Sequence, residues 1–307
     1  MRKPASIPKA RPRKKAPPRR RAPKNSAPQS DNGTSIKKAL IVGISDYNGK
    51  LPALDSPVRE IEEWRDLLMD NYGFTADNIR LLANDRARRD EIVVRLNWLF
   101  KNARPGDQLV FYFAGHGEQL QARDRNSGEI LDNMDEALVA YPSAPTDDLQ
   151  DMALYDNQLF EILVDNQVPQ GTNVTFILDC CRGGGFNSRD FPGYPNVMSV
   201  MPPVDLRHRS LHRFSDDNRP RRATAQPAEM PVLLNAAGEF NVSVEMTLEG
   251  ERRSLFSYYA LKSLRENPKQ TYSDLLSSIF GPIQQRYRLQ HPNLRGNTAR
   301  RTNPFLT

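Results

Sequence analysis

Short apolar runs alternate with amphipathic segments along most of the chain, and this alternation limits the folds that the chain can adopt. Five runs have the length and composition of buried strands: residues 37–44, 78–83, 107–115, 173–180 and 231–238. Five longer segments repeat apolar residues at helical spacing: residues 56–73, 88–103, 155–165, 254–267 and 271–287. In the first of these, Ser56 is expected to cap the helix and Pro57 to occupy its first turn. Alternating strands and helices predict an α/β fold, with a mostly parallel sheet and helices on both faces.

The charge of the chain is unevenly distributed. Of its 43 basic and 37 acidic residues, eleven basic and one acidic residue lie in residues 1–34, so this segment carries +10 and the remainder −4. Residues 1–35 are rich in Pro, Lys and Arg and hold almost no large apolar side chain, which predicts a disordered tail. Two interpretations of this tail stay open. It either contacts nucleic acid or another acidic surface, or it is a solvated spacer or a segment removed on maturation.

The chain is sparing with cysteine and lacks long apolar stretches. Its two cysteines, Cys180 and Cys181, are too few for a disulfide framework, which suits a reducing compartment. The sequence contains no run of eighteen apolar residues, so no membrane span is expected. It has no apolar N-terminal stretch, so no signal peptide is expected. We therefore expect a cytoplasmic location and, without further signals, a monomer.

Both cysteines stand at the end of one apolar run, and a histidine stands at the end of a different apolar run. His116 stands between Gly115 and Gly117 after residues 107–115, and Cys181 precedes three glycines. Chemistry in parallel sheets gathers at the carboxyl ends of strands, and a cysteine nucleophile needs a partner such as histidine. Successive strand residues alternate in direction, so Cys180 is expected to be a buried hydrophobic residue and Cys181 the nucleophile. Backbone N–H groups near Gly117 and Cys181 are expected to hold an oxyanion.

The segments "YFAGHGEQ" and "LDCCRGGG" resemble the His and Cys motifs of the caspase-like cysteine peptidases. Cys181 follows His116 by 65 positions, more than the roughly fifty quoted for caspases. Asp179 stands two positions before Cys181, where caspases carry Gln, and this resembles metacaspases and their bacterial relatives. The resemblance extends from about Lys37 to Leu306. It implies a three-layer α/β/α sandwich around a six-stranded sheet.

The resemblance also implies a division of the peptidase domain, residues 36–307. A large portion of about residues 36–190 precedes a basic flexible loop of about residues 191–229, and a small portion of about residues 230–307 follows it. The loop is crowded with arginines and is an expected site of self-cleavage, for which the candidates are Arg213, Arg221 and Arg222. The alternative is a basic insertion that contacts acidic partners and is never cut.

Metacaspases cleave polypeptides after Arg or Lys, and the resemblance implies a matching specificity pocket here. Asp179 is one expected acid of this pocket and Glu60, in "LDSPVRE", is the other. An ordinary solvated helix residue is the alternative for Glu60. The reaction, with His116 and Cys181 as the catalytic dyad, needs no cofactor.

Some metacaspases require calcium, and three acids here match the positions of such a site. They are Asp135, Asp156 and Asp190, with Asn157 where a further Asp is expected. Ca²⁺ prefers several charged oxygens, so the Asn predicts a weak site, and a solvated acidic face is the alternative. The sequence thus predicts a self-processing cysteine endopeptidase. A catalytically silent module of the same fold and a nucleic-acid-binding protein are the alternatives.

Overall fold

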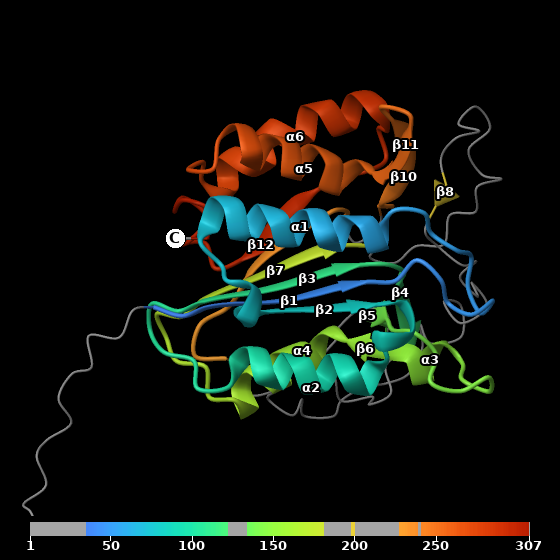
Figure 1. Ribbon diagram of the computed structural model, residues 1–307, viewed down its shortest axis with the longest axis horizontal. Helices are drawn as coiled ribbons and strands as arrows, with labels where there is room; N and C mark the ends of the chain where they lie inside the picture. The colour runs from blue at the N-terminus through green and yellow to red at the C-terminus, as the bar shows by residue number, and fades with distance from the viewer. Residues whose placement is uncertain (1–34, 122–133, 181–197, 200–226, 239–240, 307) are drawn as a thin grey trace, which may run out of the picture. The chain divides into compact units, whose positions relative to one another are not determined.

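A six-stranded sheet forms the centre of the protein (Figure 1). The computed structural model describes residues 35–121, 134–180, 198–199, 227–238 and 241–306. The strands lie in the order β12-β9-β7-β3-β1-β2, with bounds β12 (Asn293–Gly296), β9 (Val232–Asn235), β7 (Asn173–Asp179), β3 (Gln108–Ala114), β1 (Lys37–Gly43) and β2 (Ile79–Ala83). Every pairing is parallel except that of β12 with β9. This confirms the predicted mostly parallel, six-stranded sheet.

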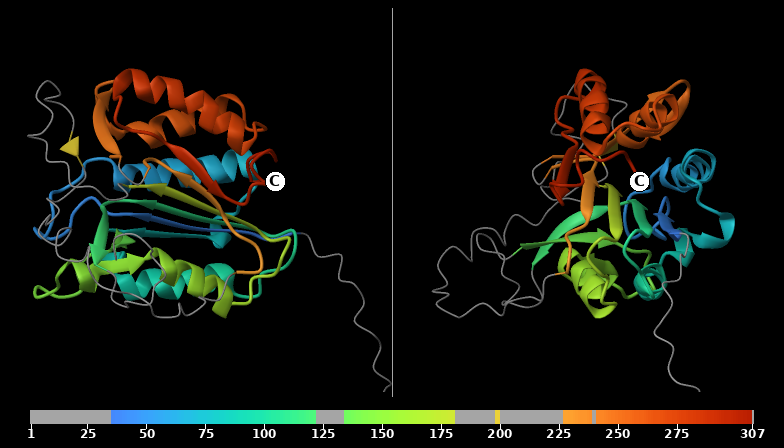
Figure 2. Two further views of the ribbon diagram at one scale, coloured as in Figure 1. Left: turned by 180° about the vertical axis from the view of Figure 1, so that it is seen from behind. Right: turned by 90° about the vertical axis from the view of Figure 1, so that its left-hand side faces the viewer.

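Helices cover both faces of the sheet, which confirms the three-layer α/β/α sandwich. One face carries α1 (Pro57–Tyr72), α5 (Leu255–Glu266) and α6 (Tyr272–Arg286). The opposite face carries α2 (Arg89–Phe100) and α4 (Asp156–Asp165), as the reverse view shows (Figure 2). Shorter elements are α3 (Leu149–Met152) and the 3₁₀ turns η1 (Ala76–Asn78) and η2 (Asn84–Arg86). No helix in the part of the chain described here is long and apolar enough to cross a membrane.

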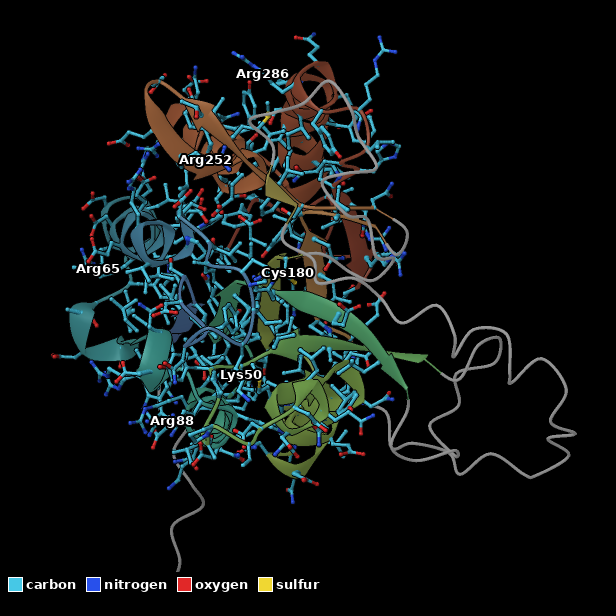
Figure 3. The ribbon with its side chains drawn as sticks, turned by 90° about the vertical axis from the view of Figure 1, so that its right-hand side faces the viewer. Lys50, Arg65, Arg88, Cys180, Arg252 and Arg286 are labelled. Atoms are coloured by element: carbon cyan, nitrogen blue, oxygen red, sulfur yellow. The ribbon has the colours of Figure 1, made fainter. Side chains whose placement is uncertain are left out.

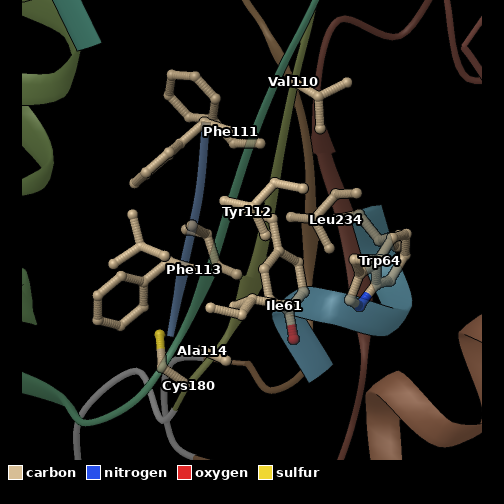
Figure 4. Packing of buried hydrophobic residues seen from close by; sticks show 14 of the residues in the cluster. Ile61, Trp64, Val110, Phe111, Tyr112, Phe113, Ala114, Cys180 and Leu234 are labelled. Carbon is tan, nitrogen blue, oxygen red and sulfur yellow. The ribbon is translucent and has the colours of Figure 1, made fainter. Parts of the chain in front are cut away.

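The core lies on both sides of β3, whose seven residues are all buried. Phe111 points to one face and packs edge-to-face on Phe176, with ring centroids 5.7 Å apart. Tyr112 points to the other face, where its ring centroid lies 5.2 Å from that of Trp64 in α1 (Figure 4). A continuous apolar run is what a central strand covered on both faces requires.

Two small sheets, which the sequence did not predict, lie beside the large one. The first contains β4 (Gly117–Gln121), β5 (Met134–Val139) and β6 (Ala153–Tyr155), and the second contains β8 (Met198–Ser199), β10 (Val244–Leu248) and β11 (Glu251–Ser254). The β10–β11 hairpin turns through Glu249 and Gly250, both with positive φ, at 53° and 86°. Two such residues in succession match the twist of an antiparallel hairpin.

The predicted disordered tail, except for Ser35, and most of the predicted basic loop lie outside the described residues. The strands on either side of that loop nevertheless belong to one sheet, because β9 pairs with β7 in parallel register. The two portions of the chain therefore share a single hydrophobic core.

Candidate active site

The His and Cys motifs follow neighbouring strands of the sheet. β3 and β7 pair in register, with Ala114 opposite Asp179. His116 comes two residues after the end of β3, and Cys180 directly follows β7. Figure 3 looks onto this end of the sheet, with Cys180 near its centre. Cys181, the expected nucleophile, is the next residue in the chain and lies outside the described residues.

Cys180 itself is a core residue. Its side chain is 1% exposed and belongs to the hydrophobic cluster between the sheet and its helices (Figure 4). A buried cysteine in apolar surroundings behaves as a small hydrophobic residue. This is the role that strand alternation predicts for Cys180.

His116 is fully buried and its ring is oriented by a main-chain carbonyl. The ring Nε2 lies 2.8 Å from the carbonyl oxygen of Pro52. A carbonyl only accepts hydrogen bonds, so Nε2 carries the proton and Nδ1 is the accepting nitrogen of the neutral ring. Burial lowers the pKa of His116 to about 4, although the bond to Pro52 acts in the opposite direction. The imidazole is therefore neutral at physiological pH, with its proton on Nε2.

Gly115, the residue before His116, has no room for a side chain because its main chain lies close to Tyr47. A Cβ atom at this position would lie 2.6 Å from the hydroxyl oxygen of Tyr47. Gly117 begins β4 and pairs with Leu138. The second expected oxyanion-hole group belongs to Cys181, outside the described residues.

Three buried carboxylates line one open cavity beside this strand end, with about 210 Å³ of space when its mouth is included. They belong to Glu60, Asp179 and Glu245, which are 2%, 5% and 2% exposed, and we call the space between them the acidic cavity. None of the described residues that line it is basic. The structure thus brings together the two expected acids of the specificity pocket and adds a third that sequence reasoning missed.

Asp179 is held by two serine hydroxyls. Ser243 Oγ donates to Oδ1 over 3.0 Å, and Ser257 Oγ donates to Oδ2 over 2.6 Å. Ser257 Oγ also lies 3.0 Å from Trp64 Nε1 and 2.8 Å from the Tyr112 hydroxyl. The indole N–H can only donate, so Ser257 Oγ accepts from Trp64 while it donates to Asp179. The Tyr112 hydroxyl also donates to Glu60 Oε2 over 3.5 Å, which links the two acids. The network fixes the carboxylate as an acceptor.

Glu60 and Glu245 are held by main-chain N–H groups. Glu60 Oε1 accepts from the N–H of Ser254 over 2.7 Å. Glu245 accepts from the N–H groups of Asp55 and Ser56 over 3.0 and 2.8 Å, and from Ser56 Oγ over 2.6 Å. The expectation that Ser56 caps α1 is wrong, because its side chain makes no capping bond and donates to Glu245 instead.

Burial changes the pKa values of two acids of the cavity, Glu60 and Asp179. It raises the pKa of Glu60 well above its ordinary value, and the charge of Asp179 raises it further. Burial also raises the pKa of Asp179, while the serine hydrogen bonds oppose that rise. Both shifts have the sign expected of carboxylates that lack a neutralising cation.

The expected calcium ligands are only partly described. Asp156 begins α4 and lines a second cavity of about 300 Å³ together with Glu118 and Glu136. Asp135 lies in β5, and Asp190 lies outside the described residues. Among the residues with described side chains, no group of three or more His, Cys, Asp or Glu is arranged to hold a metal ion.

A parallel-sheet sandwich with His and Cys motifs on neighbouring strand ends, beside a buried acidic cavity, defines a caspase-like protein. The family model "Metacaspase, peptidase C14 domain" matches residues 37–188. Metacaspase-1 of Sclerotinia sclerotiorum is 26% identical over 306 residues, covering 88% of this chain and 68% of the relative. Metacaspase-1 of Ajellomyces capsulatus is 25% identical over 302 residues, covering 87% and 81%. The chain is thus similar to the metacaspases, and these matches support a caspase-like, cysteine-type endopeptidase.

A solved structure supports the same fold. The crystal structure of protein GSU0716 from Geobacter sulfurreducens superposes with a TM-score of 0.61 at 18% identity, over 89% of this chain and 98% of the other. At this identity the likeness concerns the fold alone.

Proposed function

We propose that this endopeptidase cleaves polypeptides after Arg or Lys, with Cys181 as nucleophile and His116 as its base. The observation that supports this specificity is the acidic cavity. Three carboxylates are buried there together, and no described residue that lines the cavity carries a positive charge.

Such a cavity favours a cation from the substrate. Burying a carboxylate without a counter-ion is unfavourable, and placing several together adds repulsion. A guanidinium group offers five donors in a planar fork, which suits several carboxylates at once. The ammonium group of lysine carries the same charge, with three donors. An aspartate side chain would bring a further acid into this acidic cavity and is expected to be rejected.

The catalytic cycle needs only protein groups. Nδ1 of His116 accepts the thiol proton of Cys181, while Nε2 stays bound to the Pro52 carbonyl. The thiolate attacks the carbonyl carbon after the Arg or Lys, and backbone N–H groups near Gly117 and Cys181 hold the oxyanion. His116 then gives its proton to the leaving amine, and water hydrolyses the acyl-enzyme. No step requires a metal ion or cofactor.

A substrate panel tests both the nucleophile and the specificity. Matched peptides would carry arginine, lysine, aspartate or citrulline, the uncharged analogue of arginine, before the scissile bond. Asp179→Asn should lower kcat/KM for the arginyl peptide about 10²- to 10³-fold. It should change the citrulline peptide far less, which controls for damage to the catalytic groups. Unchanged preference for arginine over citrulline in a folded variant would place the pocket elsewhere.

The two adjacent cysteines provide a matched pair of variants for the nucleophile. Cys181→Ala should abolish cleavage, whereas Cys180→Ala should retain it, because Cys180 is a core residue. Equal loss in both variants at unchanged thermal stability would contradict the assignment of Cys181.

We also propose that the enzyme cuts its own basic loop. An acidic cavity would accept the arginines of this loop, and the portions on either side share one sheet, so they would remain associated after cutting. Intact mass spectrometry of wild type should reveal fragments ending at Arg213, Arg221 or Arg222, while Cys181→Ala should stay whole. If both stay whole where wild type cleaves an arginyl peptide, self-processing is wrong and the peptidase assignment stands.

A further inference from the structure

Tyr47 lies between β1 and α1 and is buried beside the catalytic histidine. It is 0% exposed. Its hydroxyl oxygen accepts a hydrogen bond from the backbone N–H of His116 over 2.8 Å, and the hydroxyl donates to the carbonyl oxygen of Val139 over 3.2 Å. One side chain thus connects the main chain of His116 to the end of β5.

The Tyr47 hydroxyl replaces one backbone hydrogen bond between His116, which precedes β4, and Val139, which ends β5. The N–H of Val139 donates directly to the carbonyl of His116 over 3.0 Å. In an antiparallel hydrogen-bonded pair, the return bond would run from the N–H of His116 to the carbonyl of Val139. Here that bond passes through the inserted hydroxyl. The hydroxyl thus joins the main chain of His116 to that of Val139.

The segment that carries Tyr47 also holds the imidazole ring. The ring of Tyr47 meets that of His116 edge-to-face, with centroids 4.9 Å apart. Pro52, five positions later, provides the carbonyl that accepts from Nε2. Residues 44–54 therefore contact His116 in three places: its main-chain N–H, its ring through the edge-to-face contact, and its Nε2.

This segment is itself fixed to the rest of the protein. The N–H of Leu54 donates to the carbonyl of Ser45 over 2.7 Å, which closes the segment into a loop. The N–H of Ser45 donates to the side-chain oxygen of Asn84 over 2.9 Å. A support that is anchored at its base can determine the direction of the ring that it holds.

We propose that Tyr47 is a positioning residue for catalysis, whose hydroxyl sets the place of the His116 ring relative to the thiol. This rests on the proposed role of His116 as base. Without the hydroxyl, the His116 N–H and the Val139 carbonyl must meet each other or water, and the ring moves with its backbone. A displacement of about 1 Å in a catalytic group lowers the rate by up to about 100-fold.

Tyr47→Phe tests the proposal, because it removes the hydroxyl and keeps the ring. We expect kcat for an arginyl peptide to fall about 10- to 100-fold. KM and the preference for arginine over citrulline should stay within about twofold, since the acidic cavity is unchanged. Tyr72→Phe is the matched control: Tyr72 ends α1, is 6% exposed and contacts Phe305 rather than His116. It should leave kcat unchanged.

A second measurement does not depend on activity. In Cys181→Ala protein labelled at histidine, NMR titration gives the pKa of His116 directly, with His116→Gln providing the assignment. Burial holds this pKa at about 4, so a ring released toward water should titrate closer to its ordinary value of 6.5. Tyr47→Phe should therefore raise the pKa of His116, and Tyr72→Phe should not.

The outcomes separate the two proposals. An unchanged His116 pKa together with an unchanged kcat in folded Tyr47→Phe overturns the positioning role, as does equal loss in the Tyr72→Phe control. A raised His116 pKa in a protein whose wild type cleaves no arginyl peptide supports the positioning role and refutes the proposed specificity. The melting temperature of each variant shows whether it is folded at the assay temperature.

Discussion

Glu60→Gln should stabilise the folded protein while impairing the cleavage of arginyl peptides. Glu60 is 2% exposed and shares the acidic cavity with Asp179 and Glu245. Gln retains an oxygen that can accept the N–H of Ser254, the bond that Glu60 makes over 2.7 Å, and it removes the charge. The variant therefore isolates the free energy of keeping a negative charge at this position of the acidic cavity.

The direction of the pKa shift decides how stability depends on pH, and the single titrating proton sets an upper limit to the magnitude. Burial and Asp179 raise the pKa of Glu60 in the folded protein. Its contribution to stability is then fully present below its ordinary value of 4.5 and is lost as the pH rises through the folded-state pKa. One proton corresponds to at most about 1.4 kcal/mol per pH unit, or up to about 2.7 kcal/mol between pH 4.5 and 6.5. For a domain of this size, that is a difference in melting temperature of up to about 5 °C.

Thermal unfolding of wild type and Glu60→Gln, both in a Cys181→Ala background, measures the effect. The two proteins should melt together near pH 4.5 and separate as the pH rises, with the variant more stable. Glu63→Gln is the control on the same helix: Glu63 accepts from Arg253 Nη1 over 2.8 and 3.0 Å, so its loss should lower stability at neutral pH by up to about 1 kcal/mol. A Glu60→Gln difference that is independent of pH, or negative at pH 7, would refute the electrostatic reasoning.

Two further predictions concern the surroundings of the site. Chelation of calcium should reduce activity at most slightly, since Asn157 stands where a further acid is expected; complete loss in a chelator, restored by added Ca²⁺, would contradict this. Arg253→Ala should raise KM for arginyl peptides a few-fold with little change in kcat, because Arg253 joins the hairpin that carries Glu245 to α1 through Glu63. An unchanged KM in steady-state kinetics would show that other contacts hold the hairpin in place.

The strands and helices of the sandwich could be predicted because their apolar residues repeat at regular spacing. β12 escaped prediction because it is a short edge strand, and its sequence, "NLRG", has no apolar alternation. Ser56 and Pro57 correctly indicated the start of α1, but the Ser56 hydroxyl binds Glu245 rather than its own helix. Local patterns report where elements begin and end, and tertiary contacts decide which partner a side chain takes.

Site residues that belong to a recognisable sequence motif could be predicted, whereas site residues outside the motifs could not. His116 and Asp179 stand next to recognisable strand ends. Glu245 lies 190 positions from the Asp55 N–H that it accepts, so no local pattern marks it. The carbonyl of Pro52 is a main-chain group that any residue would provide, and only the folded structure shows that it faces His116.

The acidic cavity has a consequence for the order in which the protein is made. Its walls come from distant parts of the chain, with Glu60 and Asp179 early and Ser243 and Glu245 late. Ser257, which donates to Asp179, is also late. A ribosome releases the chain N-terminus first, so a nascent chain exposes His116 and Cys181 before the residues that orient Asp179 have been synthesised. Until then, such a chain lacks the complete acidic cavity. If the proposed specificity holds, cleavage after a basic side chain can begin only once residues 243–257 have been synthesised.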